Sequence, residues 1–75
     1  MTGFGKALGE TIAHLRSKAG ISQERLADLA RIHRTYVSQL ERGLKSPTLH
    51  VLLKVALALD VRASQIVRLA EEGAE

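Results

Sequence analysis

The chain has 75 residues and no cysteine, which indicates a single domain without disulfides or thiolate metal sites. Aromatic residues are scarce, with one Phe, one Tyr and no Trp, so the core must consist of Leu, Ile, Val and Ala, a mixture suited to packed helices. The net charge is +3. No apolar run approaches the roughly 18 residues that a membrane span needs, and the N-terminal residues lack the pattern of a secretory signal. We therefore expect a cytoplasmic protein.

The positive charge is concentrated in the middle of the chain. Residues 31–50 contain four cations and one anion, which together account for the whole net charge, whereas the last residues, EEGAE, are acidic. A basic centre favours a polyanionic partner. The charged residues of this central segment are Arg31, Arg34, Arg42, Lys45 and Glu41.

The first predicted helix covers residues 4–19. Its apolar residues recur at spacings of 4, 4, 3 and 4, which places them on one helical face. Gly20 follows as a natural helix end. The residues of this face are Phe4, Leu8, Ile12, Leu15 and Ala19.

A second, shorter helix is predicted from Gln23 to Ala30, with Ser22 before it as the N-cap. Its inner face would contain Leu26, Ala27 and Ala30. Only three residues separate it from the next helical pattern. Two short helices joined by so few residues must meet at a sharp turn, which is typical of a helix-turn-helix motif rather than of a bundle hairpin.

The third predicted helix runs from about Arg34 to Arg42 and ends at Gly43. At ~100° per residue, Val37 and Leu40 define its buried stripe. The opposite half is polar and contains Thr35, Ser38, Gln39 and Arg42, while Arg34 projects from the first turn, Tyr36 lies on the flank, and Glu41 lies near the edge of the buried stripe.

The polar half of this third helix has two interpretations. It is either an ordinary solvated face or a face that reads a ligand. Solvated helix faces usually carry Glu, Lys and Ala, which favour the helix. Thr, Ser, Gln and Arg are instead the side chains that contact base edges and phosphates in DNA. Together with the tight turn and the local positive charge, they favour the second interpretation.

Two more helices are predicted after a loop of Lys45, Ser46 and Pro47. Thr48 would cap the first of them, and Asp60 would end it, since Asp tolerates the left-handed conformation. The last helix covers residues 63–72. The predicted inward residues are Leu49, Leu52, Leu53, Ala56 and Leu59 in the first of these helices and Ala63, Ile66 and Ala70 in the second.

The segment ISQERLADLARIHRTYVSQLERG, followed by SPTLHVLLKVALALDV, resembles the lambda-repressor-like, or Xre-type, helix-turn-helix family. The resemblance covers about residues 8–66, and the run HRTYVSQLERG is most similar to the controller proteins of restriction–modification systems. It implies an all-α fold, a compact five-helix lambda-repressor-like domain spanning residues 1–75. The helix-turn-helix would occupy about residues 22–42 and the dimerisation helices about residues 49–72.

The resemblance also implies a role for individual residues. Arg16 and Glu41 match a partly buried ion pair that joins the first and third helices. Base edges in the major groove would be contacted by Arg34, Thr35, Ser38 and Gln39, and the DNA backbone by Gln23, Tyr36, Arg42, Lys45 and Ser46. Gln23 would also brace the recognition helix.

Four positions depart from the family's pattern. Arg31 stands at the turn where the family usually has glycine, and a left-handed conformation there would cost about 1 kcal/mol. Asp60 likewise replaces a glycine. His33 and Arg62 replace Ser or Thr at helix N-caps, so we expect weaker capping of the third and fifth helices.

The fourth and fifth helices carry more apolar residues than one inward face requires. These are either scattered surface residues or a homodimer interface, which we favour. A two-fold dimer would place two recognition helices about 34 Å apart, matching a roughly palindromic operator. The residues assigned to this interface are Val51, Val55, Ala58, Val61, Val67 and Leu69.

The sequence therefore predicts a homodimeric, sequence-specific DNA-binding transcriptional regulator. The alternative is an antitoxin-type protein-interaction module in which DNA binding is secondary. His14, His33 and His50 lack metal-ligand spacing, and no residue pair or glycine-rich loop suggests catalysis. We expect no enzyme activity, no metal, no cofactor and no small-molecule effector.

Overall fold

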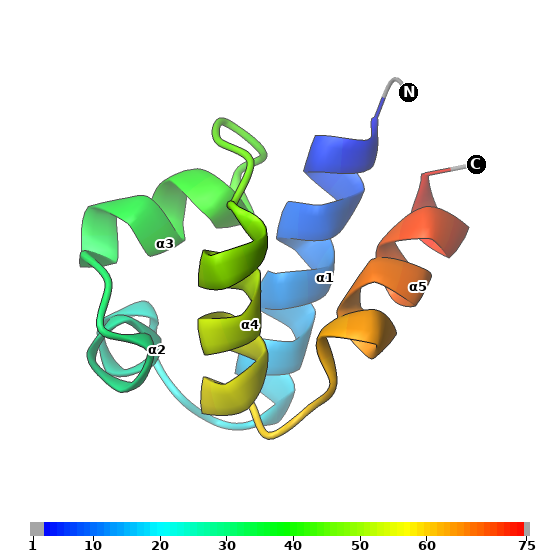
Figure 1. Ribbon diagram of the computed structural model, residues 1–75. Helices are drawn as coiled ribbons and strands as arrows, with labels where there is room; N and C mark the ends of the chain where they lie inside the picture. The colour runs from blue at the N-terminus through cyan, green and yellow to red at the C-terminus, as the bar shows by residue number, and fades with distance from the viewer. Residues whose placement is uncertain (1–2, 75) are drawn as a thin grey trace.

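The computed structural model describes residues 3–74, and within that range the chain forms five helices and no strand (Figure 1). The all-α prediction is confirmed, and the predicted helix ends agree with the observed ones to within one or two residues. The helices are α1 (Phe4–Lys18), α2 (Gln23–Ala30), α3 (Arg34–Glu41), α4 (Leu49–Ala58) and α5 (Ala63–Gly73).

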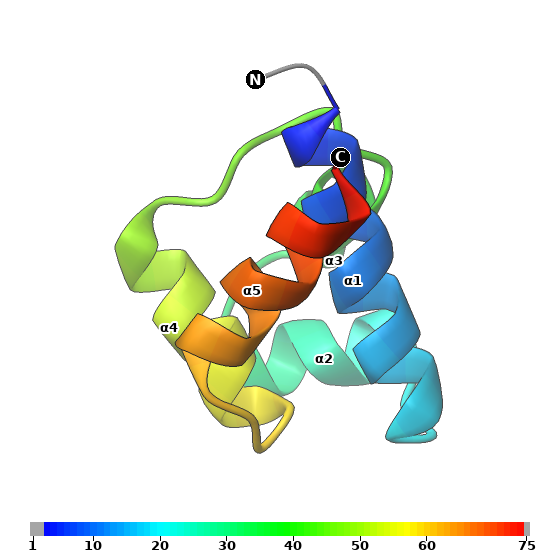
Figure 2. The ribbon, with the colours of Figure 1, turned by 90° about the vertical axis from the view of Figure 1, so that its right-hand side faces the viewer.

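The α2–α3 pair and α5 lie on opposite sides of the molecule (Figure 1). Helix α1 packs against α5 along one flank and against α3 along another, and Figure 2 shows α1 and α5 side by side. Helix α4 bridges α2 and α5. This arrangement leaves the outer faces of α3 and α4 open.

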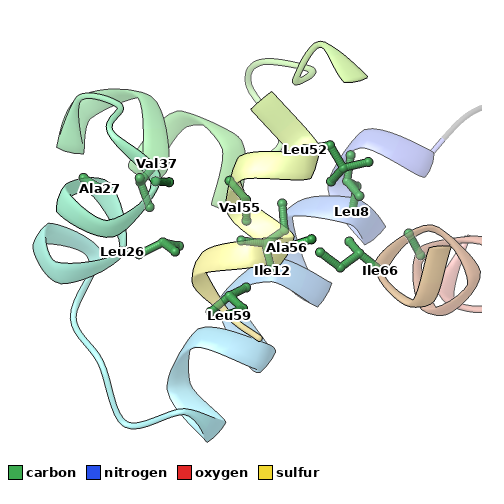
Figure 3. Packing of buried hydrophobic residues seen from close by; sticks show 12 residues of the cluster. Leu8, Ile12, Leu26, Ala27, Val37, Leu52, Val55, Ala56, Leu59 and Ile66 are labelled. Carbon is green, nitrogen blue, oxygen red and sulfur yellow. The ribbon is translucent and has the colours of Figure 1, made fainter. Parts of the chain in front are cut away.

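One continuous core joins all five helices (Figure 3). It consists of Leu, Ile, Val and Ala side chains, as the scarcity of aromatic residues predicted. The largest fully buried side chains are Ile12, Leu26, Val37, Val55 and Ile66.

The predicted inward face of α4 is partly wrong. Leu49 and Leu53 point outward and are 71% and 51% exposed. Val55, which was assigned to the dimer interface, is only 1% exposed and belongs to the core of its own chain. The reason is that α4 packs between α2 and α5, and this position selects the side of the helix that contains Leu52, Val55, Ala56 and Leu59.

Helices α2 and α4 begin at side-chain caps, whereas α1, α3 and α5 do not. The Ser22 hydroxyl accepts a hydrogen bond from the Arg25 backbone N–H at 3.0 Å, and the Thr48 hydroxyl accepts one from Val51 at 3.1 Å. Neither His33 nor Arg62 forms a cap hydrogen bond with its side chain. These observations confirm the predictions for all four positions.

Helices α1 to α4 end in the same backbone motif. In each, a residue with positive φ follows the helix, and the next residue donates its N–H to the carbonyl five positions earlier, as in a Schellman motif. In α2, for example, Ile32 N donates to Ala27 O at 3.0 Å. The positive-φ residue is Gly20 after α1 and Gly43 after α3, but Arg31 after α2 and Asp60 after α4, both at φ 58°.

Substitution of Arg31 by glycine should therefore stabilise the domain by about 1 kcal/mol, since it removes the steric cost of a left-handed Cβ. The Arg31 side chain is exposed, so no packing is lost. Asp60→Gly should gain less, because Asp tolerates this conformation better than Arg does. Urea unfolding of the parent and the two variants measures both effects. An Arg31→Gly variant that unfolds at a lower urea concentration than the parent would contradict the proposed backbone strain at Arg31.

Candidate nucleic-acid interface

Helix α3 presents a polar face opposite its buried side. Val37 and Leu40 are buried, as predicted. The other side chains keep some exposure: Arg34, Thr35 and Arg42 are exposed, whereas Tyr36, Ser38 and Gln39 are half-buried.

A small polar hollow lies where the first residue of α2 meets the first turns of α3. Gln23, Arg34, Thr35 and Ser38 line it, so a guanidinium, an amide and two hydroxyl groups converge on one space of about 160 Å³. Such a donor-rich group suits the oxygens of a phosphate or a base edge. The remaining predicted contact residues lie outside this hollow. Tyr36 and Gln39 lie elsewhere on α3, and Arg42 follows directly after it. Lys45 and Ser46 are exposed in the loop before α4.

The predicted ion pair between α1 and α3 is present. Arg16 Nε lies 2.6 Å from Glu41 Oε2, and Arg16 Nη2 lies 3.1 Å from Glu41 Oε1. The side chain of Glu41 is only 6% exposed. Hydrogen bonding to Glu41 raises the pKa of Arg16 above its usual value; burial opposes this increase, and the opposite charge of Glu41 adds to it. The two parallel N–H···O bonds make the pair bidentate, which fixes its geometry.

The same carboxylate also binds α2. Gln23 Nε2 donates to Glu41 Oε1 at 2.9 Å, and Arg16 Nη1 donates to the carbonyl of Ile21 at 2.9 Å. Glu41 thus ties together the end of α1, the start of α2 and the end of α3. The family resemblance indicated both the ion pair and a brace from Gln23 to the recognition helix, but it did not indicate that Glu41 is the partner of Gln23.

Gly9 explains how α1 and α3 come so close together. A Cβ at this position would lie 2.6 Å from the Glu41 carbonyl oxygen and closer still to that of Leu40. Only glycine permits this approach. Gly9 therefore positions the helix that carries Arg16 against the C-terminus of α3.

Among residues 3–74 no three His, Cys, Asp or Glu side chains are grouped so that they could hold a metal ion. Within that same range no helix is long and apolar enough to cross a membrane.

Comparison with known proteins identifies the family. The helix-turn-helix family model matches residues 12–66, which include α2, α3 and α4 completely. The chain belongs to the helix-turn-helix family. Among its relatives, the control protein C.BamHI of Bacillus amyloliquefaciens is 37% identical over 60 residues, which cover 79% of this chain and 74% of the relative.

Solved structures agree with this helix-turn-helix assignment. The clp gene regulator ClgR of Corynebacterium glutamicum has a TM-score of 0.91 at 28% identity, covering 96% of this chain and 92% of that one. The restriction-modification controller protein C.AhdI of Aeromonas hydrophila has a TM-score of 0.80 at 38% identity, covering 81% and 92% respectively. The lambda-repressor-like fold and the similarity to controller proteins, both predicted from the sequence, are confirmed.

Proposed function

We propose that this helix-turn-helix protein regulates transcription by binding a specific DNA sequence in the manner of a restriction–modification controller protein. It is a DNA-binding regulator and not an enzyme. The observation that carries sequence-specific DNA binding is the polar hollow between α2 and α3, which lies next to a helix face of Thr, Ser, Gln and Arg. Binding to the chromosome also implies that the protein acts in the cytoplasm.

In this proposal residues 22–42 form the reading unit. Helix α3 enters the major groove, where Arg34, Thr35, Ser38 and Gln39 contact base edges. Phosphate contacts supply affinity and orientation without sequence information. The residues proposed for the phosphate backbone are Gln23, Tyr36, Arg42, Lys45 and Ser46.

The test is salt-dependent binding to a selected duplex. Sites are selected from random DNA with the full chain, and the dissociation constant of the best site is compared with that of a scrambled duplex at several salt concentrations. Specific binding should exceed non-specific binding by about 10³-fold or more. Binding that has no salt dependence, or no preference among sequences, contradicts the proposal.

We further propose that the regulator is a homodimer, and the structure suggests a different surface from the predicted one. Three leucines on the outer face of α4, spaced four residues apart, form a stripe that is unusually exposed for apolar side chains. Leu49 is 71%, Leu53 51% and Leu57 82% exposed. A two-fold dimer that pairs this stripe with its copy would bury all three.

The predicted interface residues differ in how well they fit this surface. Val51, Ala58, Val61 and Val67 are half-buried against the core and remain partly exposed. Leu69 instead lines a shallow hollow between α1 and α5, together with Ala7, Glu10, Thr11, His14 and Gly73.

Leu57→Lys should weaken dimerisation at least about tenfold, because the interface would then bury an unpaired cation from each chain. Leu29→Lys is the matched control, since Leu29 is also an exposed leucine (44%) but belongs to α2 and not to the α4 stripe. Sedimentation equilibrium over a dilution series measures both. Equal dimerisation of the two variants would place the interface elsewhere, and a parent chain that is monomeric at high micromolar concentration would refute the dimer.

The leucine stripe also supports a second candidate, an antitoxin-type module that binds another protein through α4. In that case the chain would co-purify with an obligate partner, and its DNA binding would be weak and non-specific. Purification of the tagged chain at native expression level, followed by the selection experiment, separates the two functions.

A further inference from the structure

The Gln23 amide is held by a buried carboxylate on one side and borders the polar hollow on the other. Its Nε2 donates to Glu41 Oε1, which also accepts a hydrogen bond from Arg16 Nη2. Gln23 is half-buried, and it lines the hollow with Arg34, Thr35 and Ser38. A single side chain therefore links the interior ion pair to the proposed DNA-binding surface.

This contact fixes the orientation of the amide. A carboxylate only accepts hydrogen bonds, so the NH₂ group of Gln23, and not its oxygen, must face Glu41. Glu41 is in turn held by two hydrogen bonds from Arg16, and Arg16 is held by the Ile21 carbonyl. The amide's second N–H and its oxygen are thus the groups left for a ligand in the hollow.

An unanchored glutamine would have to be ordered when it binds. Its three side-chain torsions are free in solution, and immobilising such a side chain at an interface weakens binding. In this structure the hydrogen bond to Glu41 already holds the Gln23 amide in place.

We propose that Glu41 and Arg16 are positioning residues for DNA binding, which act by holding the Gln23 amide in place for a DNA backbone phosphate. This inference rests on the proposed function. It adds to the ion pair a second role that is separate from holding α1 and α3 together. Loss of the anchor should weaken DNA binding about threefold to tenfold, the cost of ordering one flexible side chain.

The test removes the anchor from Gln23 with a pair of variants that both also lose the Arg16–Ile21 hydrogen bond, so that this loss cancels in the comparison. Replacing both partners of a buried ion pair with apolar side chains often leaves the stability of the fold unchanged or raises it, whereas removing one partner lowers it strongly. The variant R16M/E41M therefore replaces both. R16M/E41Q is the matched control, since the glutamine introduced in place of Glu41 is also uncharged but retains an oxygen that accepts from Gln23 Nε2. DNA affinity is measured for four variants: R16M/E41M, R16M/E41Q, Gln23→Ala, and Gln23→Ala combined with R16M/E41M. Each measurement is made well below the unfolding temperature of the variant.

The positioning role predicts a specific pattern. R16M/E41M should bind DNA about threefold to tenfold more weakly than the parent, R16M/E41Q should recover most of that loss, and adding Gln23→Ala to R16M/E41M should bind no more weakly than Gln23→Ala alone. Parent-like affinity of R16M/E41M would show that the ion pair serves only the fold. Independent, multiplying losses in the triple variant would show that it acts without Gln23.

A measurement on the unmodified protein covers the case in which a variant fails to fold. The two side-chain amide protons of Gln23 should show slowed exchange with water and an ordered side chain in the free protein, with little change when DNA binds. A freely rotating Gln23 side chain in the free protein would overturn the inference. If the parent itself binds no duplex, the proposed function fails instead, so the two failures are distinguishable.

Discussion

Substitution of Gly9 by alanine is expected to destabilise the fold by about 3 kcal/mol or more, at the upper end of what overpacking costs. The new methyl group would lie against the carbonyl oxygens of Leu40 and Glu41, which are backbone atoms and cannot rotate away. The clash can be relieved only if α1 moves away from α3, and that movement would also separate Arg16 from Glu41. In a domain of this size such a loss is a large part of the total stability.

Gly5→Ala is the control for this experiment, because Gly5 lies in the same helix and its added Cβ would have only the Gly43 carbonyl at 3.8 Å, an ordinary contact. Alanine is also the better helix former, so this variant should be as stable as the parent or more stable, by up to about 1 kcal/mol. Urea unfolding followed by circular dichroism compares the three chains. Similar midpoints for the two variants would contradict the close approach of α1 and α3.

Arg34→Ala should have the largest effect on DNA recognition. Arg34 is exposed at the start of α3 and lines the hollow, so we propose that it contacts a base edge through its forked donors. Its loss should cost about 1–3 kcal/mol on the selected site and relax the preference at one base step. Competition binding against the selected site and its single-base variants measures both. Uniform weakening on all sequences would make Arg34 a phosphate contact instead.

Lys45→Ala provides the contrasting case. Lys45 is exposed in the loop between α3 and α4, outside the hollow. A phosphate contact there should give a salt slope that is smaller by about one unit when the lysine is removed, with sequence preference unchanged. An altered base preference in this variant would move Lys45 into the base-reading group.

The helices were predictable because their signals are local. Ser22 and Thr48 precede apolar patterns with helical spacing, and both act as caps in the structure. The buried side of α3 followed from Val37 and Leu40 alone, because they are the only plainly apolar residues of that helix. The ion pair was predictable only through family resemblance, since no local pattern connects Arg16 with Glu41.

The remaining features depend on contacts between distant segments. In α4 only His50 and Lys54 are polar, so an apolar pattern could not distinguish its inner from its outer side, and Leu53 and Val55 were each assigned to the wrong one. Likewise, nothing in the sequence marks Gly9 as a crossing point or Gln23 as a partner of Glu41. These features can be recognised only when the helices are placed relative to one another, and tertiary packing determines that placement.

The repeated backbone motif at the ends of α1 to α4 has a consequence for the speed of folding. Each chain reversal is closed by hydrogen bonds that span no more than five residues, so little loop-closure entropy is lost before the next helix begins. Proteins dominated by such short-range closures fold in microseconds to milliseconds. A newly synthesised chain of this kind would reach its native state within a small fraction of the time needed to translate it.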